Sequence, residues 1–156
     1  MNEKNFINNA SNEVDVLVQN ALGALEEFLA FDQEKIDYIV AKCSVAGIDS
    51  HGSLALKAIL ETKRGVFEDK ATKNLFACEY VVNNMRKLKT VGIISEDSVT
   101  GITEIAEPVG VVAGITPVTN PTSTVIFKSL ICLKTRNPII FAFHPSAQEV
   151  LRWLQK

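Results

Sequence analysis

The chain has 156 residues, of which 47% are hydrophobic and 22% charged, and its formal net charge is −2. This length and composition predict one soluble globular unit and exclude a disordered or fibrous chain. The slightly acidic balance argues against nucleic acid or an anionic membrane as a partner. We expect a cytoplasmic protein, because the N-terminus shows no secretory signal and no apolar run approaches the roughly 20 residues of a membrane span.

Residues 1–90 are predicted to be helical from the spacing of their apolar residues. The expected helices are one with apolar positions from Val14 to Leu29, one from Asp32 to Gly47, one from about Ser53 to Lys63 and one with apolar positions from Leu75 to Leu88. Ser11 or Asn12 is the expected N-cap of the first helix and Asp32 begins the second. Gly47 and Gly65 are expected to end the second and third helices.

The three cysteines, Cys43, Cys78 and Cys132, are widely separated and include no CxxC pair. This spacing favours neither a disulfide framework nor a zinc site, and we expect no metal in this chain. Each cysteine falls on the apolar face of an expected helix. We therefore predict three buried thiols in a reducing compartment.

A change of period near Val91 predicts strands. The short β-type runs Val91–Ile94 and Gly101–Ala106 flank the polar turn Ser95–Ser98. They predict a hairpin or a pair of edge strands.

A βαβ unit follows. The apolar run Val109–Ala113 precedes a polar loop, a helical pattern that ends near Asn137, and a second apolar run, Pro138–Phe143. The segment from Ser146 to Lys156 is expected to form a last helix. The fold class is therefore α/β, with N-terminal helices and a β-hairpin before a βαβ unit and a last helix.

The loop before the βαβ helix is the candidate site, because ligands of open parallel sheets bind at the carboxyl ends of strands. Asn120-Pro121 has a purely structural explanation as N-cap and first-turn proline, in which case Asn120→Ala costs about 1 kcal/mol. The functional explanation is that the Asn120 amide donates a hydrogen bond to an oxyanion at the positive end of the helix. The two are compatible, because the carbonyl oxygen caps and the NH2 group donates. At the far end, Asn137 is expected in a left-handed cap.

Two further features bear on the ligand. Gly110 and Gly114 do not form a GxGxxG fingerprint, so a dinucleotide would have to be held in another way. His144 follows the second strand, where dinucleotide folds meet the adenosine ribose. A ribose contact and a surface histidine before a proline-started helix are equally supported there, with Ser146 contributing to the cap in the second case. For His51, a structural role between helices is favoured.

The sequence resembles the bifunctional aldehyde–alcohol dehydrogenases, specifically the start of their CoA-acylating aldehyde dehydrogenase half. The similarity covers nearly all of the chain and is most specific in the long loop motif. The segments that carry it are Thr116–Thr124, Ile126–Leu130, Leu133–Asn137, Gly65–Lys70, Lys73-Asn74, Phe76–Tyr80, Ser95–Asp97 and Ile105–Pro108.

The resemblance implies an aldehyde-dehydrogenase type of Rossmann domain, which lacks the glycine fingerprint. It implies NAD contacts from Ile115, Thr116, Pro117, Val118, Thr119 and Asn120, with Asn120 also the oxyanion donor and His144 at the adenosine ribose. The implied reaction is acetyl-CoA + NADH + H+ ⇌ acetaldehyde + CoA + NAD+ through a cysteine thioester, in fermentative ethanol metabolism, with CoA as co-substrate. In that family a second, iron-dependent half then interconverts acetaldehyde and ethanol.

The sequence departs from the family by ending before the position of the nucleophilic cysteine, and its last residues, Val150–Lys156, fit the family poorly. None of the three cysteines matches the nucleophile's motif, so we expect this chain alone to be inactive and to bind NAD+ weakly. The expected organisation is residues 1–90 as the helical part of the NAD-binding domain, 91–107 as a hairpin of oligomerisation type and 108–156 as the truncated βαβα.

A second class of function stays open at this point. The helices and the hairpin would form a non-catalytic interaction module that packs on a full-length aldehyde–alcohol dehydrogenase, or the chain would assemble with copies of itself. A product without any role is the third reading.

Overall fold

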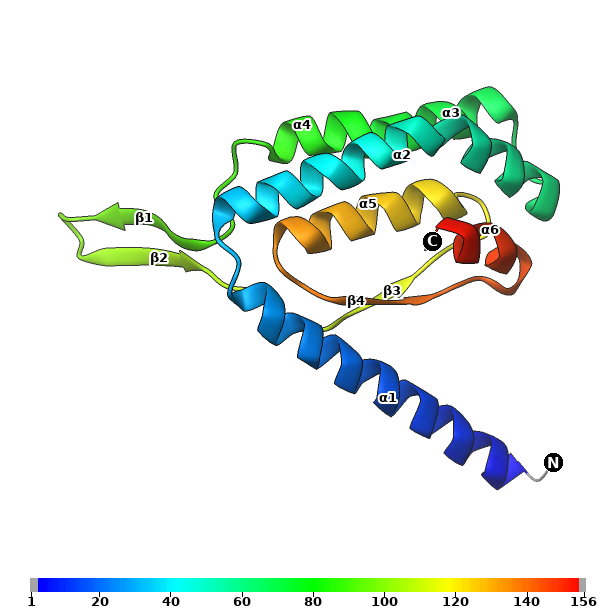
Figure 1. Cartoon of the computed structure of the whole chain (residues 1–156), viewed down its shortest axis with the longest axis horizontal. Helices are drawn as coiled ribbons and strands as arrows, with labels where there is room; N and C mark the ends of the chain where they lie inside the picture. Colours follow the sequence, from blue (N-terminus) through cyan, green and yellow to red (C-terminus); the bar gives the residue numbers. More distant parts are fainter. Residues whose placement is uncertain (1–2, 155–156) are drawn as a thin grey trace.

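The computed structural model describes the backbone of residues 3–154 and the side-chain surroundings of residues 10–154. Helix α2 and the segment α3–α4 form one layer, α5 lies against it, and a pair of strands, β3 and β4, lies beyond α5 (Figure 1). The helices are α1 (Glu3–Leu29), α2 (Gln33–Thr62), α3 (Phe67–Leu75), α4 (Val81–Met85), α5 (Pro121–Lys134) and α6 (Gln148–Leu154). The strands are β1 (Gly92–Asp97), β2 (Ile102–Ala106), β3 (Val112–Ile115) and β4 (Ile139–Ala142). The predicted α/β class is confirmed.

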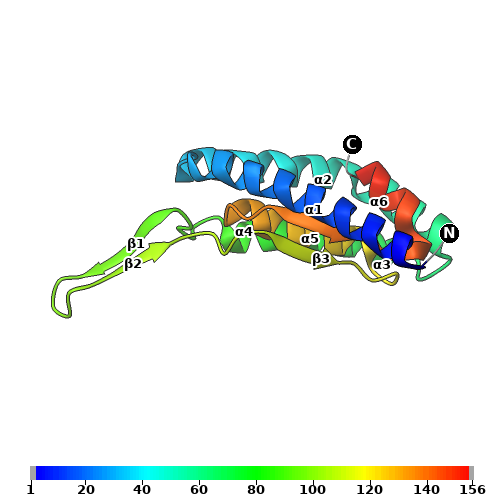
Figure 2. The same cartoon turned by 90° about the horizontal axis from the view of Figure 1, so that it is seen from below.

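Helix α1 projects from the body (Figure 1), and the β1–β2 hairpin projects from the body at a different position (Figure 2). The predicted helix is present, but Ser11 and Asn12 lie inside it and do not cap it. Much of its apolar stripe is exposed, including Val14, Leu17 and Leu29. Near the end of α1, Phe28 packs against the buried cluster.

Helix α2 begins as the sequence predicts. The Asp32 side chain accepts a hydrogen bond of 2.8 Å from the Lys35 amide and caps the first turn. The predicted end at Gly47 is wrong, since one helix runs from Gln33 to Thr62 and includes the segment expected as a third helix. Its true end is the left-handed Lys63, with φ of 55°, followed by Gly65 with φ of 77°.

Close packing explains why Gly47 lies in the middle of a helix. A Cβ atom placed on Gly47 would lie 2.5 Å from Cys78 Sγ, so the glycine lets the α3–α4 segment approach α2. Tertiary packing overrides the helix-breaking tendency of glycine, which is about 1 kcal/mol.

The predicted fourth helix is interrupted by a π-helical turn, η1 (Phe76–Tyr80), between α3 and α4. The amide of Val81 bonds back to the Phe76 carbonyl across this turn. The turn buries Ala77 and Cys78, whereas Leu88 beyond the helix is exposed. Such single π turns insert one residue into a helix and change which side chains face its neighbours.

Strands β1 and β2 form the predicted hairpin, in antiparallel pairing with Ile93 opposite Ile105. The turn lies slightly later than expected. The Asp97 carboxylate accepts bonds from the amides of Val99 and Thr100, and Gly101 has φ of 70°. At the base of the hairpin the buried Arg136 donates to the Ala106 carbonyl at 3.2 Å and to the Leu29 carbonyl at 3.3 Å. Arg136 thereby links the hairpin to the end of α1.

The βαβ unit is confirmed as a parallel pair, with Gly114 opposite Phe141 and Ile115 opposite Ala142. Strand β3 starts three residues later than the sequence suggested. The left-handed residue after α5 is Arg136, with φ of 57°, and not Asn137. Instead Asn137 accepts a bond of 3.0 Å from the Gly110 amide through its side chain.

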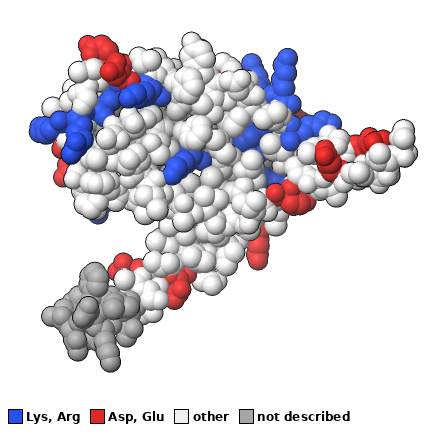
Figure 3. All heavy atoms as spheres, turned by 180° about the vertical axis from the view of Figure 1, so that it is seen from behind, with Lys and Arg blue, Asp and Glu red and all other residues white. Residues whose placement is uncertain are grey.

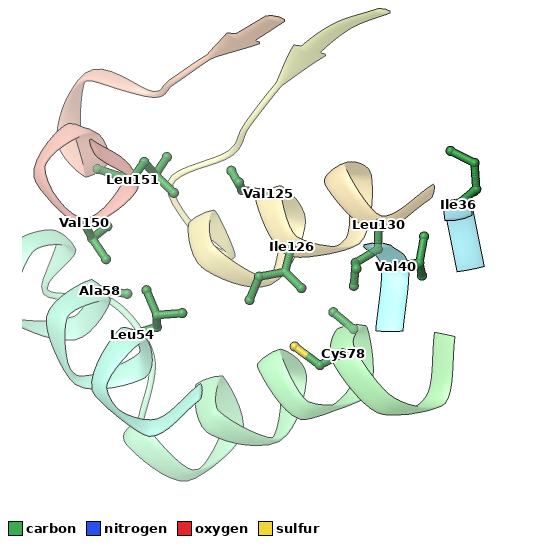
Figure 4. Packing of buried hydrophobic residues seen from close by; sticks show 12 residues of the cluster. Ile36, Val40, Leu54, Ala58, Cys78, Val125, Ile126, Leu130, Val150 and Leu151 are labelled. Atoms are coloured by element: carbon green, nitrogen blue, oxygen red, sulfur yellow. The ribbon is translucent and has the colours of Figure 1, made fainter. Parts of the chain in front are cut away.

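The core lies between α2, the η1 turn, α5 and α6, whose buried side chains point into a common space (Figure 4). The last helix follows a 3-10 turn, η2 (Pro145–Ala147), and buries Val150 and Leu151. Two amides at its start, those of Glu149 and Val150, donate to the Glu61 carboxylate of α2 at 2.9 and 2.8 Å. Residues 155–156 of the expected helix lie outside the described residues. Between residues 3 and 154, no helix is both long enough and apolar enough to cross a membrane.

Candidate functional site

The candidate site lies where the chain leaves β3 and enters α5. Thr116 is buried there, and its amide and hydroxyl lie 3.1 and 3.3 Å from the Ala142 carbonyl of β4. Ile115, Pro117 and Thr119 are exposed. His144 comes two residues after Ala142, so both predicted ligand-binding segments leave the same end of the parallel pair.

Asn120 is at the N-cap position of α5, but its side chain does not cap the helix. Only its backbone carbonyl takes part, as it accepts from the Thr124 amide at 3.2 Å. The side-chain oxygen Oδ1 accepts a bond of 3.2 Å from Lys73 Nζ instead. The prediction that Oδ1 caps the helix is therefore wrong, whereas the prediction that Nδ2 acts as a donor is not contradicted.

Three lysines bond to the loop. Lys70 Nζ donates to the Thr119 carbonyl at 2.7 Å, and Lys128 Nζ donates to the Ile115 carbonyl at 2.6 Å. Lys73 is the third, through Asn120. Burial, and to a smaller extent the neighbouring Lys73 charge, lower the pKa of Lys70. Positive charge and the amide end of α5 together favour negative charge at this corner.

Asn74 fixes the corner from inside the protein. It is fully buried, donates to the His51 carbonyl at 2.9 Å and accepts from the Thr122 hydroxyl at 2.9 Å. This one side chain connects α2, α3 and the first turn of α5. The Asn120 corner is therefore held by the body of the protein.

A hollow of about 400 Å³ opens beside Asn120, lined also by Lys73, Phe76, Ser123 and Lys128 among others. A larger hollow of about 460 Å³ lies between α2, α5 and α6, but its lining includes no charged side chain. The charged and polar lining therefore favours the hollow beside Asn120 as the binding site. Figure 3 shows basic side chains and some acidic ones on the body, and acidic side chains on the hairpin.

His144 caps the 3-10 turn that follows β4. Its Nδ1 accepts a bond of 3.1 Å from the Ser146 amide. An imidazole that accepts at Nδ1 carries its proton on Nε2 when neutral, so Nε2 is available as a donor. The histidine itself provides the cap, to which Ser146 contributes only its backbone amide. His51 was expected between two helices, but it lies inside α2, where its Nδ1 is 2.5 Å from the Ile48 carbonyl.

The three thiols differ from the prediction at one position. Cys78 and Cys132 are buried as expected, but Cys43 is exposed. Burial raises the pKa of Cys78 to about 11, and desolvation also raises the pKa of Cys43 and Cys132. An activated nucleophile needs a lowered pKa, so none of these thiols has that character. Among the described side chains, no three His, Cys, Asp or Glu residues gather as a metal site.

Sequence reasoning missed Lys70, Lys73 and Asn74 as parts of the site. Their spacing places them on one face of α3, and a polar face of this kind usually meets solvent. The apolar residues of the same segment drew attention to the opposite face. Within the sequence, only the matches of Gly65–Lys70 and Lys73-Asn74 to the family pattern pointed to them.

No family model matches the chain. The aldehyde-alcohol dehydrogenase of Streptococcus pneumoniae serotype 4 is 76% identical over 140 residues, which are 90% of this chain and 16% of that relative. The structure of an acetylating aldehyde dehydrogenase from Geobacillus thermoglucosidasius matches with a TM-score of 0.89 and 46% identity, over 92% of this chain and 32% of that one.

Two more distant structures carry ligands. A Rhodopseudomonas palustris propionaldehyde dehydrogenase with bound propionyl-CoA has a TM-score of 0.72 and 29% identity over 90% of this chain and 31% of that one. An engineered glycolyl-CoA reductase with bound NADP+ has a TM-score of 0.72 and 28% identity over 90% of this chain and 32% of that one. The chain thus spans about a sixth of the pneumococcal relative and about a third of the matched structures.

Proposed function

The chain is similar over 90% of its length to the N-terminal part of the bifunctional aldehyde–alcohol dehydrogenases, and we propose that it contributes the first part of the NAD-binding domain of a CoA-acylating acetaldehyde dehydrogenase. In this proposal the reaction interconverts acetyl-CoA and NADH with acetaldehyde, CoA and NAD+. Residues 1–90 and 108–156 belong to the cofactor domain, and 91–107 form the hairpin.

The proposal rests on the hydrogen bonding and the exposure to a hollow of the Asn120 side chain. Its oxygen is engaged by Lys73, no bond to the helix backbone holds it, and it borders an open hollow. Nδ2 then provides the hydrogen bond to the oxyanion of a tetrahedral thiohemiacetal. Lys128 and the amide end of α5 add a positive field, which favours that anion over the neutral ground state.

The exposed residues of the loop fit a dinucleotide. Ile115, Pro117 and Thr119 offer a surface without charged side chains at the end of β3, while Thr116 fixes the backbone. In the proposed complex the loop residues from Ile115 to Asn120 contact NAD, and His144 Nε2 donates to a ribose hydroxyl. NAD supplies hydride transfer when bound.

The thioester step needs a thiolate, and we assign that role to none of Cys43, Cys78 and Cys132, because desolvation raises each pKa. In this proposal the nucleophile is supplied by a part of the enzyme outside these 156 residues. We expect residues 1–156 alone to produce no NADH from acetaldehyde, CoA and NAD+.

The proposal is tested with a chimera in which the matching segment of the pneumococcal relative is replaced by that of this chain. Acetaldehyde, CoA and NAD+ are mixed with the chimera, and the absorbance of NADH is followed against the parent enzyme. We expect CoA-dependent NADH formation within a few-fold of the parent rate. A chimera that folds and assembles like the parent but forms no NADH contradicts the proposal, as does turnover by residues 1–156 alone.

A second function, self-association through the hairpin, has its own support. Ile93 and Ile105 face each other across the hairpin and are 52% and 57% exposed, and Val99 at its tip is 93% exposed. An isolated two-stranded hairpin is marginally stable, so this one gains most from a second copy of the chain that covers its isoleucines. Sedimentation velocity is expected to show a dimer or larger species that Ile105→Lys converts to monomer, and a monomeric wild type contradicts this.

A further inference from the structure

One face of α3 holds the start of α5. Lys70, Lys73 and Asn74 are spaced by three and four residues, so they share a face of the helix. Their partners are consecutive features of the corner, namely the Thr119 carbonyl, Asn120 Oδ1 and the Thr122 hydroxyl. Each of these bonds joins residues 47–49 positions apart in the chain.

Of these three residues, Lys73 bonds to the side chain of Asn120, the proposed oxyanion donor. An ammonium group donates hydrogen bonds and accepts none, so the atom of Asn120 that faces it is the oxygen. The NH2 group of the same planar carboxamide is then on the side away from Nζ. The lysine also polarises the amide, because a hydrogen bond to its oxygen withdraws electron density from the nitrogen and makes Nδ2–H a stronger donor.

We propose that Lys73 is a positioning residue for the oxyanion donor, which orients the Asn120 carboxamide and strengthens its hydrogen bond to the tetrahedral adduct. This inference rests on the function proposed above for Asn120. It assigns Lys73 no contact with substrate or cofactor.

The neighbouring lysines do not have this role. Lys70 is 5% exposed and bonds to the Thr119 backbone, so its loss disturbs the whole corner. Lys128 bonds to the Ile115 backbone, on the cofactor side of the loop. Lys73 is exposed, and the bond recorded for its ammonium group goes to Asn120, so it can be replaced with little effect on folding.

The test uses the catalytically competent chimera with Lys73→Met, Lys73→Arg, Asn120→Ala and the Lys73→Met/Asn120→Ala double variant. Lys42→Met, an exposed lysine that packs over Tyr38 of α2, is the matched control. Each variant is assayed for kcat, for KM of NAD+, for NADH binding by fluorescence titration and for thermal midpoint.

We expect Lys73→Met to lower kcat about tenfold, the effect of one weakened charge-assisted hydrogen bond, with NADH binding and the thermal midpoint unchanged. Lys73→Arg restores most of kcat, and the double variant is no slower than Asn120→Ala. If Asn120→Ala lowers kcat but Lys73→Met leaves it unchanged, or if the two effects multiply, the positioning role is overturned. It is also overturned if Lys73→Met lowers kcat and the thermal midpoint together. If Asn120→Ala itself leaves kcat unchanged, the proposed function of the corner fails as well.

Discussion

Asn74 and Thr122 lie 48 positions apart in the chain and are joined inside the protein by a hydrogen bond of 2.9 Å from Thr122 Oγ1 to Asn74 Oδ1. The same asparagine donates to the His51 carbonyl, so both ends of its carboxamide are satisfied without water. Because a buried polar group is costly when it loses its partner, this contact sets the position of the α5 N-terminus against α2 and α3.

Asn74→Ala is expected to lower the free energy of unfolding by about 2–3 kcal/mol, because the Thr122 hydroxyl and the His51 carbonyl lose their partner. Thr122→Val removes one donor and should cost about 1 kcal/mol. Urea unfolding followed by circular dichroism measures both. Asn84→Ala is the control, since Asn84 is exposed and its side chain bonds to the Tyr80 carbonyl of its own helical segment, and it should change stability by at most about 0.5 kcal/mol. Equal losses for Asn74→Ala and Asn84→Ala would contradict the buried network.

Two glycines inside helices should respond to alanine with opposite signs. At Gly47 a Cβ meets Cys78 Sγ at 2.5 Å, so Gly47→Ala is expected to destabilise by about 1–3 kcal/mol through overpacking. At Gly23 nothing lies within 4 Å of the added Cβ, so Gly23→Ala should stabilise α1 by up to about 1 kcal/mol.

The Gly47 effect should depend on the sulfur. Adding Cys78→Ala removes the atom that the new methyl group meets, so Gly47→Ala should cost less in that background than in the wild type. Chemical denaturation of the four proteins forms a double-mutant cycle. If the cycle shows no coupling energy, contact with Cys78 Sγ is not the cause of the loss of stability in Gly47→Ala.

The Cys78 thiol should make stability fall at alkaline pH. Burial raises its pKa from the ordinary value of 9.0 to about 11 in the folded protein. Its folded pKa lies above the unfolded one, so the contribution to stability is complete below about pH 9 and is lost as pH rises toward about 11. Unfolding free energies at pH 8 and pH 10.5 measure this loss. The decline should be smaller in Cys78→Ala, and an identical decline in both proteins would refute the assignment.

Much of the fold could be predicted because its signals are local. The Asp32 cap, the hairpin between Val91 and Ala106 and the parallel strands around α5 each depend on short patterns of apolar, turn and capping residues. Gly47 could not be predicted, because its reason is the approach of Cys78 from another helix. The exposure of Cys43 could not be predicted either, because the sequence places this residue on an apolar helical face that is exposed in the structure.

The position of the candidate site could be predicted from the sequence, but the residues that hold Asn120 in place could not. The place of Asn120, between a strand and a proline-started helix, identified the corner from sequence. The pattern also suggested a side-chain cap, which is the commonest role of asparagine at such a place. Instead Lys73, which lies 47 positions earlier, donates a hydrogen bond to Asn120 Oδ1. This bond depends on the packing of α3 against α5, which the sequence alone does not show. The same arrangement buries Lys70 and Asn74 on a face that the sequence alone assigns to solvent.

The Asn120 side chain should contribute little to folding, in contrast to the sequence-based expectation of a cap. Since no backbone amide of α5 bonds to it, Asn120→Ala in residues 1–156 should lower the free energy of unfolding by at most about 0.5 kcal/mol. Urea unfolding of the wild type and the variant measures the difference, and a loss near 1 kcal/mol would restore the capping role.

The most direct test of the account is the kcat of Asn120→Ala in the chimera that carries this segment. If the amide binds the oxyanion, kcat for CoA-dependent acetaldehyde oxidation falls about 10²–10³-fold. If kcat stays within about threefold of the parent chimera in a variant of unchanged stability, the amide is not an oxyanion donor and the proposed role of the corner is contradicted.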